Sequence, residues 1–181
     1  MGERGQVIVL SGPPGAGKST VARLLTAEQS LSVHLHSDDF WANIVTGGIP
    51  PYMPDSGQQN QIVMTVLANA ALGYAQGGYY VVVDGVVGPW YIGEFRIAAA
   101  GSGIPLHYVI IMPDEETTIR RGVGRGETAL TDPGPIQDMY KQFRDLGEYE
   151  VHAIDSTGRD AADTTRLVKA GLAAGRFRLN P

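Results

Sequence analysis

Short apolar runs alternate along the chain with longer stretches in which hydrophobic residues recur at helical spacing. The apolar runs predict strands over residues 6–10, 33–36, 79–84, 106–112 and 152–155. The stretches between them predict helices over residues 18–28, 59–76, 91–100, 115–122, 136–146 and 161–174. Strands that alternate with helices are typical of a parallel sheet covered by helices on both faces. We therefore expect a three-layer α/β fold with a central parallel sheet of five strands.

The helix over residues 59–76 has a clear apolar stripe. Ile62, Val66 and Ala70 lie four residues apart, and such residues share one side of a helix. The stripe is flanked by Val63, Leu67, Ala71 and Tyr74. We expect this side to pack on the sheet. The two glycines that follow predict the end of the helix, because glycine favours helix carboxyl ends.

Two segments follow neither period. Residues 46–54 form a loop rich in glycine and proline that also carries apolar side chains. Residues 120–135 combine several glycines with a Pro-Gly-Pro sequence, a composition typical of a mobile flap between two helices. We expect this second segment to be a lid. If the helix before it continued through the glycines, Arg121 and Arg125 would share one helix face.

The composition narrows the class of protein. A length of 181 residues suits a single domain over residues 1–181. Hydrophobic residues make up 43% and charged residues 18% of the chain, as in globular proteins, and no apolar run is long enough to cross a membrane. With no signal peptide and no cysteine, we expect a cytoplasmic protein without membrane attachment. The net charge of -5 argues against nucleic acid as a partner.

The stretch GPPGAGKST carries the strongest chemical signal. It has the spacing G-x-x-x-x-G-K-[ST] between a predicted strand and a predicted helix, which makes the expected fold that of a P-loop NTPase. Glycines let the backbone wrap around a polyphosphate, and the amino end of a helix attracts its charge. Lys18 is expected to reach the β- and γ-phosphates of ATP, and Ser19 to bind Mg²⁺. The expected ATP-binding residues are Gly12, Pro13, Pro14, Gly15, Ala16, Gly17, Lys18, Ser19 and Thr20.

A second magnesium ligand is predicted at the end of the third strand. Three valines lead into Asp84, and an apolar strand that ends in a carboxylate is the usual partner of a phosphate loop in holding Mg²⁺. The chain has no Asn-Lys-x-Asp sequence that would recognise guanine, which argues against a GTPase. Ser19 and Asp84 are therefore the expected Mg²⁺ ligands.

Two neighbouring carboxylates, Asp38 and Asp39, follow the second strand. Ligands of parallel α/β sheets lie at the carboxyl ends of the strands, so a carboxylate here can face the γ-phosphate and take the proton of an incoming hydroxyl. Adjacent residues that leave a strand point to opposite sides, so only one of the two is expected there. The other is expected to cap the start of a following helix. A purely structural alternative is that the pair only caps that helix.

With these residues the chain resembles the P-loop kinases that phosphorylate small molecules. This group includes chloramphenicol phosphotransferase, gluconate kinase, the zeta-type toxin kinases and the kinase domain of phage polynucleotide kinase. The resemblance implies that Asp38 is the general base and that Asp39 is the cap. Residues 120–126 and 139–143 look like the lid and following helix of the polynucleotide kinase, which implies that Arg121 and Arg125 contact the transferred phosphate. Trp41 replaces an arginine of that kinase, so a polynucleotide is not the expected acceptor.

Apolar side chains near these loops predict the acceptor pocket. They are Trp41, Tyr52, Met53, Trp90 and Tyr91. Each of them alone is explained at least as well by packing, but as a group they favour a small organic acceptor with a flat or apolar part. His34 and His36 alternate along the second strand and are interpreted as structural.

Together these features predict a phosphotransferase that uses ATP and Mg²⁺ and acts on a hydroxyl of a small organic acceptor. Its expected catalytic residues are Lys18, Asp38, Arg121 and Arg125. Two alternatives stay open from the sequence: a nucleotide-dependent regulatory ATPase or switch, and a nucleoside or polynucleotide 5′-kinase.

Overall fold

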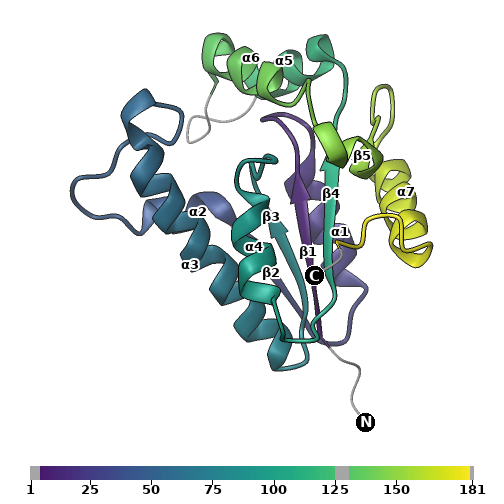
Figure 1. The fold of residues 1–181 in the computed structure, drawn as a ribbon. Helices are drawn as coiled ribbons and strands as arrows, with labels where there is room; N and C mark the ends of the chain where they lie inside the picture. Colours follow the sequence, from purple (N-terminus) through teal and green to yellow (C-terminus); the bar gives the residue numbers. More distant parts are fainter. Residues whose placement is uncertain (1–4, 125–130, 180–181) are drawn as a thin grey trace.

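Five strands form one parallel sheet at the centre of the protein (Figure 1). The computed structural model describes residues 5–124 and 131–179. The strands are β1 (Gln6–Ser11), β2 (Ser32–His36), β3 (Tyr80–Asp84), β4 (Leu106–Ile111) and β5 (Ala153–Ile154). Their order is β2-β3-β1-β4-β5, and every neighbouring pair is parallel. The predicted five-stranded parallel sheet is confirmed.

Helices cover both faces of the sheet and complete the predicted three layers. The helices α1 (Lys18–Ala27) and α7 (Ala161–Ala173) lie on one face, and α3 (Gly57–Gln76) and α4 (Ile92–Ala99) lie on the other (Figure 1). In β1, Ile8 packs toward α1 and α7, whereas its neighbour Val9 packs toward α3 and α4. Strands that are buried on both faces need apolar residues at successive positions, which is why they are continuous apolar runs in the sequence.

The structure describes three further helices and two 3-10 turns. They are α2 (Ser37–Ala42), α5 (Glu115–Val123), α6 (Pro133–Gln142) and the 3-10 turns η1 (Pro54–Ser56) and η2 (Gly147–His152). Figure 1 shows α5 and α6 across the carboxyl edge of the sheet. Within residues 5–124 and 131–179, no helix combines the length and apolar character that a membrane span requires.

The buried face of α3 differs from the predicted one. Ile62 and Val66 are 58% and 52% exposed, so the predicted stripe faces outward. The buried residues of this helix are Asn60, Val63, Met64, Leu67, Ala68, Ala71, Leu72 and Ala75. Apolar residues occupy neighbouring stripes of α3, and the stripes that contain several alanines lie against the sheet, because small side chains let the helix approach closely. The end of α3 at Gln76, with Gly77 as its C-cap, is as predicted.

Of the two helices beside the expected lid, one is as predicted and the other is shifted. The helix α5 begins at Glu115 as expected and ends at Val123, one residue beyond the predicted end, with Gly124 as its C-cap. The helix α6 begins at Pro133, three residues earlier than expected. Asp132 caps it by accepting a backbone hydrogen bond at 2.9 Å, and proline suits the first position of a helix. Residues 125–130, the middle of the expected lid, lie outside the described residues.

The order of the strands places a crevice at the carboxyl edge of the sheet. The chain leaves β1 toward α1 on one face, and it leaves the neighbouring β3 toward α4 on the other. Such a change of direction keeps the two loops apart and is where α/β proteins bind ligands. The fold thereby brings the loops after β1, β2 and β3 to one cavity.

Leu67→Ala and Val66→Ala test which side of α3 packs on the sheet. Leu67 is fully buried, so its truncation removes apolar contacts and leaves a void, and we expect the free energy of unfolding to fall by about 2–5 kcal/mol. Val66 is exposed, so Val66→Ala should alter the free energy of unfolding by less than about 0.5 kcal/mol. Urea unfolding followed by circular dichroism measures both. Equal losses in the two variants would contradict this orientation of α3.

Candidate active site

Two glycines of the loop between β1 and α1 have no room for a side chain. A Cβ at Gly12 would lie 2.2 Å from the carbonyl oxygen of Ile111, and a Cβ at Gly15 would lie 2.4 Å from that of Thr118. Both glycines also have positive φ angles, 139° and 87°, which other residues rarely adopt. The loop is therefore wedged between the end of β4 and α5, in a shape that lets its backbone curve around a phosphate.

Lys18 is buried against this loop at the start of α1. Its Nζ donates hydrogen bonds to the carbonyl oxygens of Gly12 and Pro13, both at 2.9 Å. The ammonium group is thereby fixed beside the amino end of the helix, whose unpaired amides attract anions. Of the next two predicted residues, Ser19 lines the cavity described below, whereas Thr20 is exposed.

The carboxylate of Asp84 is buried at the end of β3, where the side chain is 1% exposed. Nε2 of His34 lies 3.4 Å from one carboxylate oxygen, and Nε2 of His36 lies 3.6 Å from the other. Burial alone would raise the pKa of Asp84. The combined effect of His34, Ser19 and His36 is larger and opposite, so the pKa of this carboxyl lies below its ordinary value. Neither oxygen accepts a hydrogen bond from the residues that the structure describes.

The two histidines beside Asp84 are His34 and His36, which the sequence analysis interprets as structural residues. Their side chains share one side of β2 because side chains alternate along a strand. Pairing of β2 with β3 places His36 opposite Asp84. The sequence pattern shows that the two histidines alternate along one strand. It does not show that this strand pairs with β3, which lies more than 40 residues later in the sequence, so the contact with Asp84 was missed. The histidines therefore form part of the surroundings of the predicted metal ligand.

Asp38 and Asp39 lie in the first turn of α2, a short helix that the helix ranges predicted from the sequence do not include. Asp38 lines the cavity and accepts a hydrogen bond from Oγ of Ser37 at 3.3 Å. The side chain of Asp39 is 78% exposed and lies 3.8 Å from Nδ1 of His36. The expected cap by Asp39 is wrong, because α2 begins at Ser37 and its N-cap residue is His36, without a side-chain cap. The two carboxylates diverge because successive residues of a helix point in different directions.

The start of α2 is pressed against the loop that follows β3. A Cβ at Gly85 would lie 2.2 Å from Oγ of Ser37, so only glycine allows this contact. The same loop is tied to β1 because Oγ of Ser11 donates to the carbonyl oxygen of Val87 at 2.6 Å and accepts from its amide at 3.1 Å. The hydroxyl of Tyr108 also donates to that carbonyl, at 2.6 Å. These contacts fix α2 relative to the phosphate loop.

A cavity of about 580 Å³ joins the phosphate loop to a space with apolar walls. Lys18, Ser19 and Asp38 line it. The residues expected to contact the acceptor line it as well: Trp41, Tyr52, Met53, Trp90 and Tyr91. Further side chains come from α3 and α6. The predicted phosphate site and the predicted acceptor pocket therefore share one space.

Asn60 is a buried polar residue of the cavity wall that sequence reasoning missed. Its Nδ2 donates to the carbonyl oxygen of Pro51 at 2.8 Å and to Oγ of Ser56 at 2.9 Å. Its Oδ1 accepts a hydrogen bond from Nε1 of Trp41 at 3.0 Å. The residues at 58–61 are all amides, so nothing in the sequence distinguishes this one. Asn60 joins an aromatic wall residue to the loop before α3.

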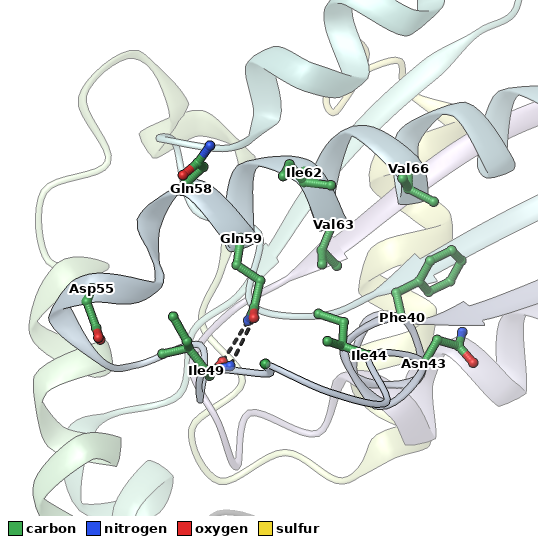
Figure 2. Close-up of a pocket in the computed structure, with 11 residues that line it drawn as sticks. Phe40, Asn43, Ile44, Ile49, Asp55, Gln58, Gln59, Ile62, Val63 and Val66 are labelled. Carbon is green, nitrogen blue, oxygen red and sulfur yellow. Dashed lines mark hydrogen bonds between the residues drawn. The ribbon is translucent and has the colours of Figure 1, made fainter.

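A second groove, of about 570 Å³, lies between α2, α3 and the segment that joins them (Figure 2). Figure 2 shows apolar side chains such as Phe40 and Ile44 in its wall, and a pair of hydrogen bonds at its floor. The Gln59 side chain accepts from the amide of Ile49 at 2.9 Å and donates to its carbonyl at 2.7 Å. Because Gln59 and Asn60 are adjacent, one turn of α3 holds the connecting segment at two points.

Of the two arginines of the expected lid, the structure describes only Arg121. Arg121 lies on α5, where its guanidinium donates to the carbonyl oxygen of Arg159 at 3.3 Å and does not line the cavity. Arg125 lies outside the described residues. Contact of either arginine with a transferred phosphate stays a prediction.

Comparison with known proteins assigns the chain to a family. Residues 7–145 match the model of the AAA domain family. The chain belongs to this family. The match of this AAA domain runs from β1 past the end of α6, so it includes the phosphate loop, both aspartates of α2 and the wall of the cavity. No curated protein sequence matches the chain.

Solved structures share the fold at low sequence identity. A tunicamycin resistance protein from Deinococcus radiodurans has a TM-score of 0.67 and 16% identity, covering 98% of this chain and 100% of that one. A gluconokinase from Sinorhizobium meliloti has a TM-score of 0.67 and 19% identity, covering 95% and 94%. The APS kinase of Mycobacterium tuberculosis in complex with AMPPNP and APS has a TM-score of 0.63 and 19% identity, covering 94% and 99%. The predicted resemblance to P-loop kinases is thus confirmed at the level of the fold.

Gly85→Ala tests whether close contact between Gly85 and Ser37 is required. The added methyl group collides with Ser37, so we expect the free energy of unfolding to fall by about 1–3 kcal/mol. Gly93→Ala is the matched control, because Gly93 lies inside α4 and a Cβ there meets no atom within 4 Å. That variant should gain up to about 1 kcal/mol, since alanine favours helix more than glycine does. Urea unfolding measures both, and a stabilised Gly85→Ala protein would contradict the contact.

Proposed function

We propose that the protein is a phosphotransferase that moves the γ-phosphate of ATP to a hydroxyl group of a small organic acceptor, with Mg²⁺ as cofactor. One observation carries the proposal: a single cavity is lined by the phosphate loop, by Asp38 and by the aromatic residues of the predicted acceptor pocket. An enzyme that only hydrolyses ATP needs no more space beside the γ-phosphate than a water molecule occupies. A cavity of about 580 Å³ has room for an organic ligand.

The residues of the phosphate end fit ATP and Mg²⁺. The phosphates would lie on the backbone of residues 12–17, with the ammonium group of Lys18 beside them. Ser19 and Asp84 would hold the metal ion. Both oxygens of Asp84 are buried without a donor among the described residues, and carboxylate and hydroxyl oxygens are the ligands that Mg²⁺ prefers. When bound, the ion neutralises charge on the β- and γ-phosphates.

Asp38, which lines the cavity, would receive the proton of the acceptor hydroxyl. In the proposed reaction, the acceptor oxygen forms a bond to the γ-phosphorus while the bond from that phosphorus to the bridging oxygen breaks, and ADP leaves with the electron pair. The hydroxyl proton passes to the carboxylate of Asp38. Lys18 stabilises the negative charge of the transferred group. Because phosphoryl transfer depends mainly on positioning and electrostatics, these side chains supply most of what the step needs.

The comparisons support this class of reaction without naming the acceptor. A gluconokinase and an APS kinase share the fold, so one scaffold serves kinases for different acceptors. The acceptor of this chain must therefore be inferred from its own pocket. The net charge of -5 argues against a polynucleotide, whose phosphates attract basic surfaces.

A transfer assay with ATP labelled in its γ-phosphate tests the proposal. The protein is incubated with Mg²⁺, labelled ATP and a panel of hydroxyl compounds, and the organic products are separated from inorganic phosphate. We expect one class of compound to become labelled at a rate above phosphate release without acceptor. Equal phosphate release with every compound would support a regulatory ATPase instead. Labelling of nucleosides or 5′-hydroxyl oligonucleotides alone would support a 5′-kinase.

Lys18→Met tests the phosphate site. Methionine keeps the apolar stem of the side chain but removes the ammonium group, so we expect transfer to fall at least about 10²-fold while the fold is retained. The melting temperature and circular dichroism of the variant serve as controls for folding. Transfer at the wild-type rate with any acceptor would contradict the assignment of this loop to ATP.

Asp38→Asn and Asp39→Asn form a matched pair that tests the general base. Asparagine keeps the shape of the side chain but does not accept the hydroxyl proton, so we expect the Asp38 variant to lose about 10²- to 10⁴-fold in turnover with nearly unchanged ATP affinity. The Asp39 variant removes an exposed charge from the same helix turn and should retain transfer. Turnover and ATP affinity are measured for both with one identified acceptor. Loss of transfer in the Asp39 variant alone would reverse the assignment.

A further inference from the structure

We propose that the acceptor is an uncharged hydroxyl compound that carries a flat apolar ring, and that acceptors with a carboxylate, sulfate or phosphate group are excluded. The proposal rests on the phosphotransferase function and names the substrate class of its cavity. Three features of the cavity support it: the charges on its wall, the apolar character of its surface, and the rigid placement of its aromatic rings.

The charges on the wall disfavour an anionic acceptor. Among the described residues, one lysine and no arginine line the cavity. That lysine is Lys18, whose Nζ is held by the carbonyl oxygens of Gly12 and Pro13 at the phosphate loop. Asp38 contributes a carboxylate where the acceptor hydroxyl must lie. His36 also lines the cavity, but its two ring nitrogens face the carboxylates of Asp39 and Asp84. Among the described lining residues, a second anionic group on the acceptor would therefore meet the carboxylate of Asp38 and no arginine, the side chain that usually binds carboxylates and phosphates.

The surface beyond the phosphate end is apolar and largely aromatic. It is formed by Trp41, Tyr52, Met53, Trp90, Tyr91 and Met139. Aromatic rings pack well against other flat rings, and thioethers also make favourable contacts with aromatic groups. A sugar acid or a polyol would leave these surfaces without apolar partners. A ring-bearing alcohol would cover them while its hydroxyl reaches the carboxylate of the base.

The ring of Trp90 is held by its neighbours. It lies directly over Gly88, where a Cβ would come within 2.3 Å of the ring. It also packs edge-on against Tyr91 and Phe143, with ring centroids 6.3 and 5.5 Å apart. A wall that is ordered before binding loses little conformational freedom when a ligand arrives. This favours a rigid flat ligand over a flexible chain.

The ring of Trp41 is fixed by a hydrogen bond that stays within the wall. Its Nε1 donates to Oδ1 of Asn60 at 3.0 Å, and the amide nitrogen of Asn60 donates to Pro51 and Ser56. With the indole N–H engaged in this way, Trp41 offers its ring and not its polar atom to a ligand. We therefore expect Trp41 to favour ligands that present an apolar surface to its ring.

Tryptophan fluorescence reports on this cavity directly, because the chain has two tryptophans and both line it. The probes are 1-phenylethane-1,2-diol and the same diol with a carboxylate at the para position of the ring. Both are titrated into protein saturated with Mg²⁺ and a non-hydrolysable ATP analogue. We expect the neutral diol to bind at least about tenfold more tightly, since like charges across an interface are unfavourable. Equal or tighter binding of the carboxylate overturns the proposal.

A positive charge added to the wall should weaken the preference for the neutral probe. Met53→Arg places a cation at an exposed part of the cavity wall, and we expect it to tighten binding of the carboxylate probe about fivefold relative to the neutral diol. Val45→Arg is the matched control: it adds the same charge to the same segment, but Val45 is 93% exposed and lines neither cavity. An equal gain in both variants would show a general charge effect and contradict the proposal that the wall lacks a cation for an anionic acceptor.

The transfer assay separates failure of this inference from failure of the proposed function. We expect label in neutral ring-bearing alcohols and none in sugar acids, adenosine phosphosulfate or nucleoside phosphates. Label in those anionic compounds but not in the neutral alcohols overturns the substrate class while the phosphotransferase function stands. Absence of label in every compound overturns the function itself, and the substrate class with it.

Discussion

Burial of the Asp84 carboxylate is the constraint on which the arrangement of the site depends. A carboxylate withdrawn from water is unfavourable unless nearby groups compensate for its lost hydration. Here the compensating groups come from both sides, because β3 lies between β2, which carries two histidines, and β1, which leads into the phosphate loop. The position that isolates Asp84 from solvent therefore also brings the loops after three strands together. A different strand order would leave the carboxylate buried without these neighbours.

Local features of the site and fold were predictable from the sequence, whereas contacts between distant segments were not. The phosphate loop follows from residues 12–20 alone, because turn, helix start and lysine lie within one short stretch. The sheet follows from apolar runs, because strands buried on both faces need apolar residues throughout. In contrast, the outward side of Ile62 and the hydrogen bonds of Asn60 depend on what packs against α3. Periodicity shows that a helix has an apolar side, but it does not show which of several neighbouring apolar stripes is buried against the sheet.

The helix α3 links the stability of the fold to the shape of the proposed acceptor pocket. Its alanine-rich side lies against the sheet, so the position of its first turn is set by the core. From that turn, Gln59 binds the backbone at Ile49, and Asn60 binds Pro51 and Trp41. The segment between α2 and α3 has few backbone hydrogen bonds of its own, and these amide side chains take their place. A loop without regular structure is thereby given a defined shape.

The two ends of the cavity follow opposite physical rules, and each makes the other more effective. At the proposed phosphate end, Lys18 would act on the phosphates through its charge, and such interactions are stronger where water is excluded. At the proposed acceptor end, aromatic side chains supply apolar surface and would exclude water when a ligand covers them. A neutral ring-bearing acceptor would thus raise the strength of the electrostatic contacts that act on the phosphate beside it. An anionic acceptor would add charge to that space and retain water around it, which would weaken the same contacts.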